Sequence, residues 1–154
     1  MIKLKDILLE GKPPTIFVPR RMEDRIERLI KTYIRNGSKG DLNLHGLHLT
    51  VLPDILKDIT VGGHFDCSVN KLTSLINAPK IVGESFYCDN NQLISLKGAP
   101  TYVGNNFICS YNKLTSLEGA PSSVGEDFIC NNNPVKFTRE QVRAVCNVKK
   151  KVFV

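Results

Sequence analysis

Residues 85–105 read SFYCDNNQLISLKGAPTYVGN, and residues 64–84 and 106–126 are near-copies of this 21-residue unit. A fourth copy begins at Asp127 and departs from the pattern after Asn133. A fixed period this short predicts a solenoid, because each unit can bury its apolar residues only with the help of its neighbours. Solenoids commonly present extended binding surfaces, so the repeat favours a binding function over a catalytic one.

Five positions of the repeat predict its buried side. The phenylalanine and the cysteine stand two residues apart, so both point to the same side of a strand. Two leucines and a valine complete the set, which in one copy is Phe86, Cys88, Leu93, Leu96 and Val103. Stacked copies then form a parallel β-sheet with one strand per repeat. The rings expected to lie directly over one another are those of Phe65, Phe86, Phe107 and Phe128.

Three further positions predict the loops. An inward asparagine can satisfy backbone N–H and C=O groups of its own and the adjacent copy, with ligand binding as the alternative. These asparagines are Asn70, Asn91, Asn112 and Asn133. The glycine after each valine predicts a turn with a positive φ, at Gly62, Gly83, Gly104 and Gly125. The Ala-Pro pair of each copy predicts a bend between the leucines and the return to the sheet.

The cysteines predict a column of free thiols. Four of the five occupy the same position of successive copies: Cys67, Cys88, Cys109 and Cys130. Equivalent side chains point the same way, whereas a disulfide needs Cβ vectors that face each other. No C-x-x-C pair indicates zinc. We therefore expect buried reduced cysteines and no metal or other cofactor, with a metal site or disulfides as the alternative.

Residues 41–63 predict an irregular first copy, in which Leu42 and Leu44 replace the phenylalanine and the cysteine. The offset to the next copy is 23 residues at the leucines but 21 at the valine. Two extra residues therefore lie between these points, at residues 53–56. Five stacked repeats in all are expected over residues 41–133, with atypical units at both ends.

The N-terminal part predicts helical structure. Residues 20–35 carry apolar residues at helical spacing, and Arg20, Arg21, Arg25 and Arg28 leave a membrane-surface role open. Because solenoids need their open ends covered, a cap is the favoured interpretation. Residues 3–10 predict a short amphipathic helix, and residues 15–18 predict an extended stretch. We assign residues 1–40 to an N-terminal cap.

The C-terminal part predicts a second cap over residues 134–154. Val135 takes the position of the first repeat leucine. Thr138 and Gln141 have the spacing of a capping box, which predicts a short helix. The apolar face of that helix is expected to contain Val142, Val145 and Cys146. Residues 152–154 predict one more strand, and the whole chain, residues 1–154, is expected to be a single domain.

The net charge of +6 is unevenly distributed. Residues 1–41 hold ten Lys and Arg against six Asp and Glu, residues 42–133 hold five against eight, and residues 134–154 hold six against one. A nucleic-acid binder gathers positive charge along its working surface, so the mildly acidic repeats argue against nucleic acid as the partner. The run Lys149–Lys151 keeps nucleic-acid contact through the basic ends as an alternative.

The sequence also predicts a cytoplasmic protein. No stretch of it is apolar enough to span a membrane. Its first ten residues mix charged with apolar side chains and lack a small-residue cleavage site, which argues against a signal peptide. Reduced cysteines are typical of the same compartment.

The motif Phe-x-Cys-x-x-Asn-x-Leu-Thr-x-Leu resembles the leucine-rich repeat L-x-x-L-x-L-x-x-N-x-L. More closely, Asn-Lys-Leu-Thr-Ser-Leu with Gly-Ala-Pro and Val-Gly resembles the small leucine-rich-repeat-like proteins of tailed bacteriophages and of some bacterial genomes. The resemblance covers essentially the whole chain. It implies an α/β repeat fold, a leucine-rich-repeat-like solenoid with a parallel β-sheet, capped by an N-terminal helix and a short C-terminal helix. A glycine stands where a typical leucine-rich repeat has a leucine, three residues before each phenylalanine.

On this analogy, outward strand residues line a candidate partner-binding face. They are His64, Asp66, Ser68, Ser85, Tyr87, Asp89, Asn106, Ile108, Ser110, Asp127, Ile129 and Asn131. An apolar column bounded by polar residues is typical of a recognition site. We expect partner contacts at Asp66, Tyr87, Asp89, Ile108, Tyr111 and Ile129. The alternatives are that the terminal helices cover this face, or that these residues serve only strand formation.

We therefore expect a non-enzymatic protein-binding module, and the resemblance implies a host protein as its partner in the host cytoplasm. A structural or virion-associated protein, docked through its basic ends, is the alternative. An enzyme is not expected, because no nucleophile pattern, metal-ligand spacing or paired carboxylates accompany the three histidines. His45 and His48 are interpreted as surface residues of the first copy.

Overall fold

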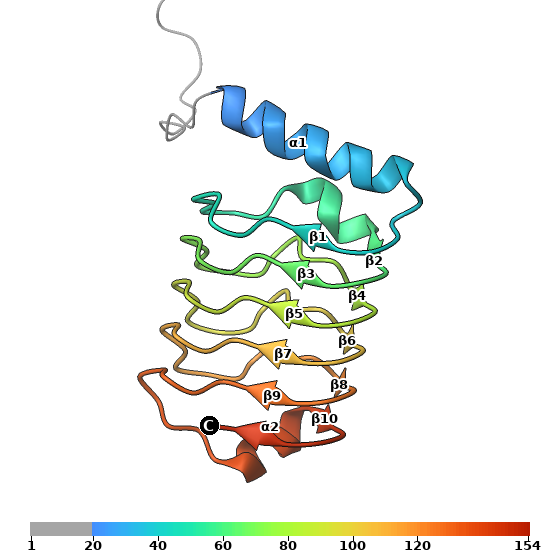
Figure 1. The fold of residues 1–154 in the computed structure, drawn as a ribbon. Helices are drawn as coiled ribbons and strands as arrows, with labels where there is room; N and C mark the ends of the chain where they lie inside the picture. The colour runs from blue at the N-terminus through green and yellow to red at the C-terminus, as the bar shows by residue number, and fades with distance from the viewer. Residues whose placement is uncertain (1–19) are drawn as a thin grey trace, which may run out of the picture.

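Two parallel β-sheets run along the stack of repeats in the computed structural model, which describes residues 20–154 (Figure 1). The segments expected at residues 3–10 and 15–18 lie outside the described residues. Each copy contributes one two-residue strand to each sheet. The described residues therefore form a leucine-rich-repeat-like α/β solenoid, as expected.

The first sheet, called sheet A, has six strands in the order β1-β3-β5-β7-β9-β11. Each begins at the Phe position of the repeat or its equivalent. The strands are β1 (Leu42–Asn43), β3 (Phe65–Asp66), β5 (Phe86–Tyr87), β7 (Phe107–Ile108), β9 (Phe128–Ile129) and β11 (Val152–Phe153). Leu42 pairs with Phe65 and Val152 with Phe128. The irregular first copy and the expected last strand are thus confirmed.

The second sheet, called sheet B, was not expected from the sequence. Its strands are β2 (Thr60–Val61), β4 (Ile81–Val82), β6 (Tyr102–Val103), β8 (Ser123–Val124) and β10 (Asn147–Val148). The valine of each copy, expected at a turn, is the inward residue of these strands.

The apolar core lies between the two sheets and has the composition expected. The Phe, Cys, Leu and Val positions of the middle copies are almost all inaccessible to solvent. The ring centroids of successive phenylalanines, from Phe65 to Phe128, are 5.3, 5.4 and 5.1 Å apart. The continuous spine of stacked rings is therefore confirmed, and so is the burial of Cys67, Cys88, Cys109 and Cys130 as free thiols.

The asparagines tie adjacent copies together through their amides. Asn91 accepts a hydrogen bond from the Leu72 N–H at 2.9 Å and donates to the carbonyl oxygens of Cys67 and Cys88, at 3.0 and 3.2 Å. Asn70, Asn112 and Asn133 repeat this arrangement. The structural interpretation of these side chains is confirmed, because the backbone engages both ends of each amide.

The positive φ expected at the glycine after each valine was wrong. None of Gly62, Gly83, Gly104 and Gly125 has a positive φ. A Cβ atom at Gly104 would instead overlap with the carbonyl oxygen of Gly83, and one at Gly125 with that of Gly104. These positions need glycine because neighbouring copies approach closely at the corner between the sheets. In this part of the repeat, positive φ values occur instead at the bend before the Ala-Pro pair, at Asn77, Gly98 and Gly119.

Helix α1 (Arg20–Arg35) covers the first copy, with the bounds expected. Ile26, Ile30 and Tyr33 are buried in the common core. The Tyr33 hydroxyl donates to the Ser38 carbonyl at 2.6 Å, which fixes the exit of the helix. A 3-10 helix (Asp54–Asp58) accommodates the two extra residues of the first copy. The expected helical cap is therefore confirmed for residues 20–40, the part of it that the structure describes.

Helix α2 (Arg139–Val145) covers the other end of the core and begins with the expected capping box at Thr138 and Gln141. Val142 and Cys146 are buried, but Val145 is 49% exposed. Val135 is 38% exposed, while Phe137 is buried. The place expected for Val145 on the buried face of this helix was therefore wrong. The chain leaves the path of the repeat after Asn133, as expected, and inserts Phe137 into the core. Neither helix within residues 20–154 combines the length and apolar character needed to cross a membrane.

Candidate protein-recognition face

The outward residues of sheet A form three parallel columns, because the strands pair in register from copy to copy. The residue before each strand contributes to the flank column: Asp41, His64, Ser85, Asn106 and Asp127. The second residue of each strand contributes to the middle column: Asn43, Asp66, Tyr87, Ile108, Ile129 and Phe153. The residue two further along contributes to the far column: His45, Ser68, Asp89, Ser110 and Asn131.

The flank column is a ladder of hydrogen bonds between copies. Each of its side chains accepts a hydrogen bond from the backbone N–H of the equivalent residue in the next copy, over 2.8–3.3 Å. The donors are the N–H groups of His64, Ser85, Asn106, Asp127 and Lys151. Since the His64 Nδ1 accepts, its Nε2 carries the proton and donates to Glu84 at 2.8 Å. These side chains are therefore used by the fold itself.

The far column also makes contacts within the protein. The Ser110 hydroxyl bonds the side chain of Asn131, and Asp89 accepts from Asn90 at 2.7 Å. Ser68 and Ser110 are 5% and 4% exposed, and Ser85 of the flank column is 2% exposed. Their expected place on the outer surface was wrong. Strand alternation gives the direction of a side chain, but contacts between copies decide whether it reaches solvent.

A serine, a histidine and an aspartate meet at the N-terminal end of the face. The Ser68 hydroxyl donates to Asp66 Oδ1 at 2.6 Å and lies 2.9 Å from His45 Nδ1. Because the hydroxyl proton is directed to Asp66, the imidazole donates to the serine oxygen. A catalytic triad needs the opposite direction, with the imidazole accepting the hydroxyl proton. The cluster fixes the Asp66 carboxylate at the end of the middle column.

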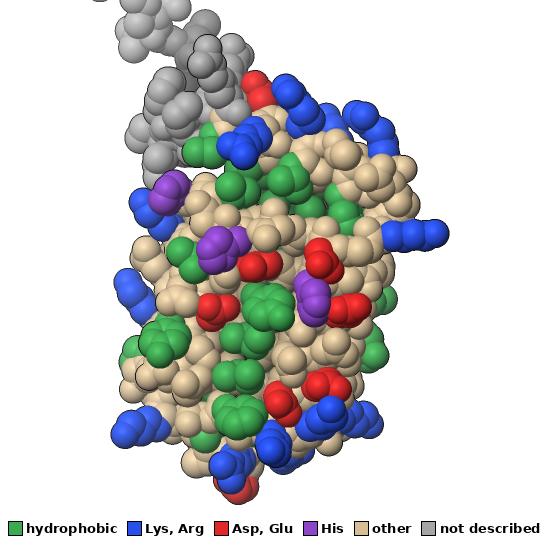
Figure 2. All heavy atoms as spheres, in the orientation of Figure 1, with side chains coloured by type: hydrophobic (Ala, Val, Ile, Leu, Met, Phe, Trp, Pro, Cys, Tyr) green, Lys and Arg blue, Asp and Glu red, His purple; other side chains and the backbone are tan. Residues whose placement is uncertain are grey.

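The middle column differs because four successive members are apolar. Tyr87 pairs with Ile108, Ile108 with Ile129, and Ile129 with Phe153. The first three are half-buried and Phe153 is 43% exposed. Figure 2 shows hydrophobic side chains running down this face, with acidic groups beside them. We call these four residues the apolar column.

Neither α1 nor α2 crosses this face (Figure 1). For these two helices the alternative of a covered face is therefore wrong, whereas the helix expected at residues 3–10 lies outside the described residues. Sequence reasoning placed Tyr87, Ile108 and Ile129 in one column correctly and missed Phe153. The signal was present, because the Val152-Phe153 pair follows the pattern of the Phe-x pair that opens each copy.

The other expected contact residues lie around the apolar column. Asp66 precedes it in the same column, and Asp89 lies in the far column. Tyr111 is 57% exposed, and its backbone has a φ of 52°. The same left-handed conformation recurs one copy apart at Val69, Asn90, Tyr111 and Asn132. Asn is commonly found in this conformation, whereas a β-branched or bulky residue there is unfavourable.

Four of the five cysteines have the chemistry of core residues, whereas a hydrogen bond with Cys109 lowers the pKa of the fifth, Cys130. Burial raises the pKa of the Cys67, Cys88 and Cys109 thiols well above the ordinary value. Burial also raises the pKa of Cys146 to about 11. They are therefore protonated at neutral pH and weak nucleophiles. Within residues 20–154, no three metal-ligating side chains converge on one point.

The fold and this face define a leucine-rich-repeat-like solenoid with a continuous, partly exposed apolar column. No protein-family model matches the chain, and comparisons with curated proteins and with solved structures return no significant match.

Proposed function

We propose that this protein is a non-enzymatic binding module that contacts a partner protein through the apolar column of sheet A. The observation that carries the proposal is the difference between the three outward columns. The flank and far columns make hydrogen bonds that hold the copies together, whereas the side chains of the apolar column make none within residues 20–154. Four apolar side chains in register form a contiguous surface, and such surfaces mark recognition sites.

The left-handed backbone of Tyr111 and Val69 supports the same face. Such a conformation costs about 1–2 kcal/mol in a residue other than Gly or Asn. Asn occupies the equivalent position in two copies, Asn90 and Asn132, so the fold does not require Tyr or Val there. Both side chains are exposed, at 57% and 46%. Exposed apolar residues held at an energetic cost are expected where they contact a partner.

The charges around the apolar column define the chemistry of the partner. Asp66, Asp89, Asp127 and Glu84 are partly or fully exposed beside it, and residues 42–133 carry five Lys and Arg against eight Asp and Glu. The partner surface is therefore expected to be apolar at its centre and rimmed by Lys or Arg. The resemblance described above makes a host protein, met during bacteriophage infection, part of this proposal.

The test compares two matched double variants. Tyr87→Asp with Ile108→Asp places two charges in the apolar column. Ile81→Asp with Tyr102→Asp places the same two changes on sheet B, where these residues also pair in register and are 44% and 46% exposed. Each protein is used for affinity purification from infected bacterial cells, followed by quantitative mass spectrometry. A partner that is retained by the wild type and the sheet B variant, and lost with the sheet A variant, supports the proposal.

Circular dichroism and urea unfolding first establish that both variants fold. Retention of the same partner by the Tyr87→Asp, Ile108→Asp variant would overturn the assignment of the face. Loss of the partner from the sheet B variant alone would place the binding surface on the opposite sheet.

A further inference from the structure

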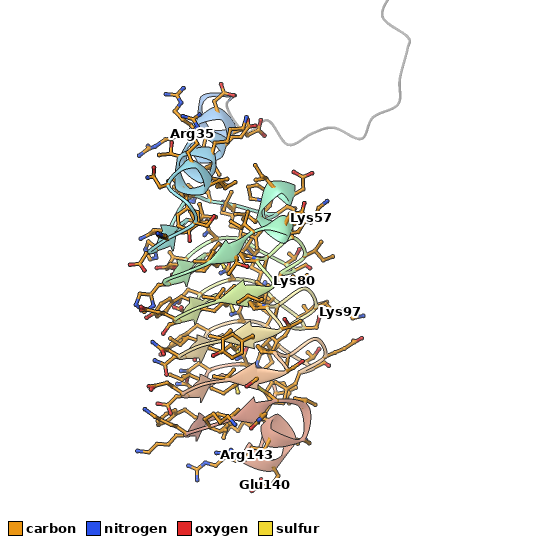
Figure 3. All side chains as sticks on the ribbon, turned by 90° about the vertical axis from the view of Figure 1, so that its right-hand side faces the viewer. Arg35, Lys57, Lys80, Lys97, Glu140 and Arg143 are labelled. Carbon is orange, nitrogen blue, oxygen red and sulfur yellow. The ribbon has the colours of Figure 1, made fainter. Side chains whose placement is uncertain are left out.

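The two sheets end differently at the C-terminal end of the solenoid. In earlier copies, the sheet B valine carbonyl and a carbonyl at the next corner accept N–H groups of the following copy. In the last copy these oxygens belong to Val148 and Lys150. The Arg143 guanidinium donates to both, at 2.7 and 2.6 Å, and Figure 3 shows Arg143 on α2 at this end of the stack. Arg143 therefore replaces two N–H groups that a further copy would supply.

Sheet A has no equivalent cap among the described residues. In its inner strands, the N–H groups at the Phe and Cys positions donate to the next strand. Phe107 donates to the Asp127 carbonyl at 2.9 Å, and Cys109 donates to the Ile129 carbonyl at 2.8 Å. Val152 and Val154 occupy these positions on the last strand, and β11 has no neighbour beyond it in the order of sheet A. Their N–H groups therefore point to an open edge.

A basic groove lies beside this edge. It has a volume of about 470 Å³ and is lined by Arg139, Arg143, Lys150, Lys151, Val152 and Phe153. Four of the six lining residues are cations and none is a carboxylate. One of these charges is already compensated, since Lys150 pairs with Glu126 at 2.6 Å. Arg139 and Lys151 also line the groove, and neither forms an ion pair with a described residue.

We propose that the edge of β11 binds an extended acidic segment of a partner protein, which adds to sheet A as a further strand. Main-chain hydrogen bonds to Val152 and Val154 supply affinity, and the alternating side chains supply specificity. One set of side chains faces the groove and Arg139, where acidic residues are favoured. The other set continues the outward column beside Phe153, where apolar residues are favoured. The segment is thus expected to alternate acidic and apolar residues.

The charges argue against two other occupants. Residues 134–154 carry six Lys and Arg against one acidic residue, so the β11 edges of two molecules of this protein repel each other. A nucleic acid would satisfy the positive charge, but it has no extended peptide backbone to pair with two N–H groups at strand spacing. The test below distinguishes both of these occupants from the acidic segment.

The probe is a fluorescein-labelled peptide in which Glu and Val alternate, with a Lys-Val peptide of the same length as the control. Fluorescence anisotropy should show binding of the first peptide alone. Hydrogen exchange, followed by NMR, should become slower at the Val152 and Val154 amides when the acidic peptide binds. Slower exchange at these two amides is specific to strand addition, because a peptide bound only by charge leaves them in contact with water.

Two variants separate the contribution of backbone hydrogen bonds to peptide binding from the contribution of charge. Val154→Pro removes one edge N–H and leaves the core intact, because the Val154 side chain is 45% exposed. It should weaken peptide binding about fivefold, as expected for one lost hydrogen bond, whereas Val154→Ala should bind as the wild type does. Arg139→Glu should weaken binding about tenfold or more, whereas Lys113→Glu, a charge change of the same size on the repeats, should have little effect.

The proposal is overturned if the acidic peptide does not bind the wild type, or if Val154→Pro and Val154→Ala bind equally well. Binding of a DNA duplex together with no protection of the two amides would assign the groove to nucleic acid. If sedimentation shows a dimer of the wild type and a monomer of Val154→Pro, the edge would be assigned to a second molecule of this protein. The Tyr87→Asp, Ile108→Asp variant should still bind the peptide, so the failure of one site does not imply the failure of the other.

Discussion

Sheets A and B are made by the same repeats, yet they use their residues differently. Inside, sheet A contributes a stack of phenylalanine rings, whereas sheet B contributes a column of valines. Outside, sheet A carries four consecutive apolar residues in register. The outward column of sheet B is mixed: Thr60, Ile81, Tyr102, Ser123 and Asn147.

This difference shows which residues the fold requires. A repeat needs its inward residues, its asparagine and its corner glycine in every copy, so these positions change little along the chain. The outward columns are free to vary unless they form contacts between copies, as the flank column does. Among the described residues, the side chains of the apolar column make no such hydrogen bond, yet they are apolar on four successive strands. This is the reason to assign the column a function.

The largest effect is expected from the inward side. Phe107→Ala should lower the free energy of unfolding by about 4 kcal/mol, because it removes one of the two inner rings of the stack and leaves a cavity. Val103→Ala, at the inward position of sheet B in the preceding copy, should cost about 2 kcal/mol. Urea unfolding followed by circular dichroism measures both. Equal losses would mean that the stacked rings contribute no more than the valines.

The corner between the sheets should respond almost as strongly. Gly104→Ala should cost about 3 kcal/mol, because its Cβ would overlap with the Gly83 carbonyl oxygen and push two copies apart. Gly62→Ala is the matched control, since its Cβ would lie 3.0 Å from the Ser38 oxygen and needs only a small shift. Thermal unfolding should therefore rank Gly62→Ala well above Gly104→Ala in stability. A reversed ranking would contradict close approach as the reason for these glycines.

The thiols beneath sheet A should make stability depend on pH. Unfolded thiols ionise near pH 8.5, whereas burial raises the pKa of Cys67, Cys88 and Cys109 well above the ordinary value. Above that pH the unfolded state releases protons that the folded state retains, so stability falls as pH rises. Each thiol should contribute about 1.4 kcal/mol per pH unit.

Urea unfolding at several values between pH 8 and pH 10 measures this slope. Cys88→Ala should reduce the slope by the contribution of one thiol. Val103→Ala should lower stability by a similar amount at every pH and leave the slope unchanged. An unchanged slope in Cys88→Ala would show that the Cys88 thiol does not ionise on unfolding.

Most of the fold follows from the sequence because the fixed spacing of the repeat shows which residues of successive copies pair. The ring stack, the asparagine contacts, the cap helices and the last strand were all predicted from residues at fixed spacing. The glycines were misinterpreted because glycine serves both positive φ and close approach, and only the position of the adjacent copy distinguishes them. Ser85 was misplaced for a related reason: the side chain points outward, but the ladder between copies covers it.

The site was harder to predict than the core. The residues of the apolar column could be aligned from the repeat, but the function of their neighbours could not. The residue types of the flank column are Asp, His, Ser and Asn. Nothing in them indicates that each side chain accepts a hydrogen bond from the backbone of the next copy. The Arg143 contacts were also missed, because they depend on the path of the chain after α2 rather than on any motif.

The smallest expected effect is also the one that links stability to function. Tyr111→Asn should raise the free energy of unfolding by about 1 kcal/mol, because Asn tolerates the left-handed backbone at this position. Tyr102→Asn on sheet B, where φ is not positive, should instead be slightly destabilising, since Asn is unfavourable in a strand. The two variants lose the same exposed side chain, so urea unfolding isolates the contribution of the backbone. If Tyr111→Asn is more stable and also loses the partner of the apolar column, then the tyrosine is retained for binding at a cost to the fold. If it is not stabilised, the left-handed backbone stores no strain, and the argument for Tyr111 as a contact residue rests on its exposure alone.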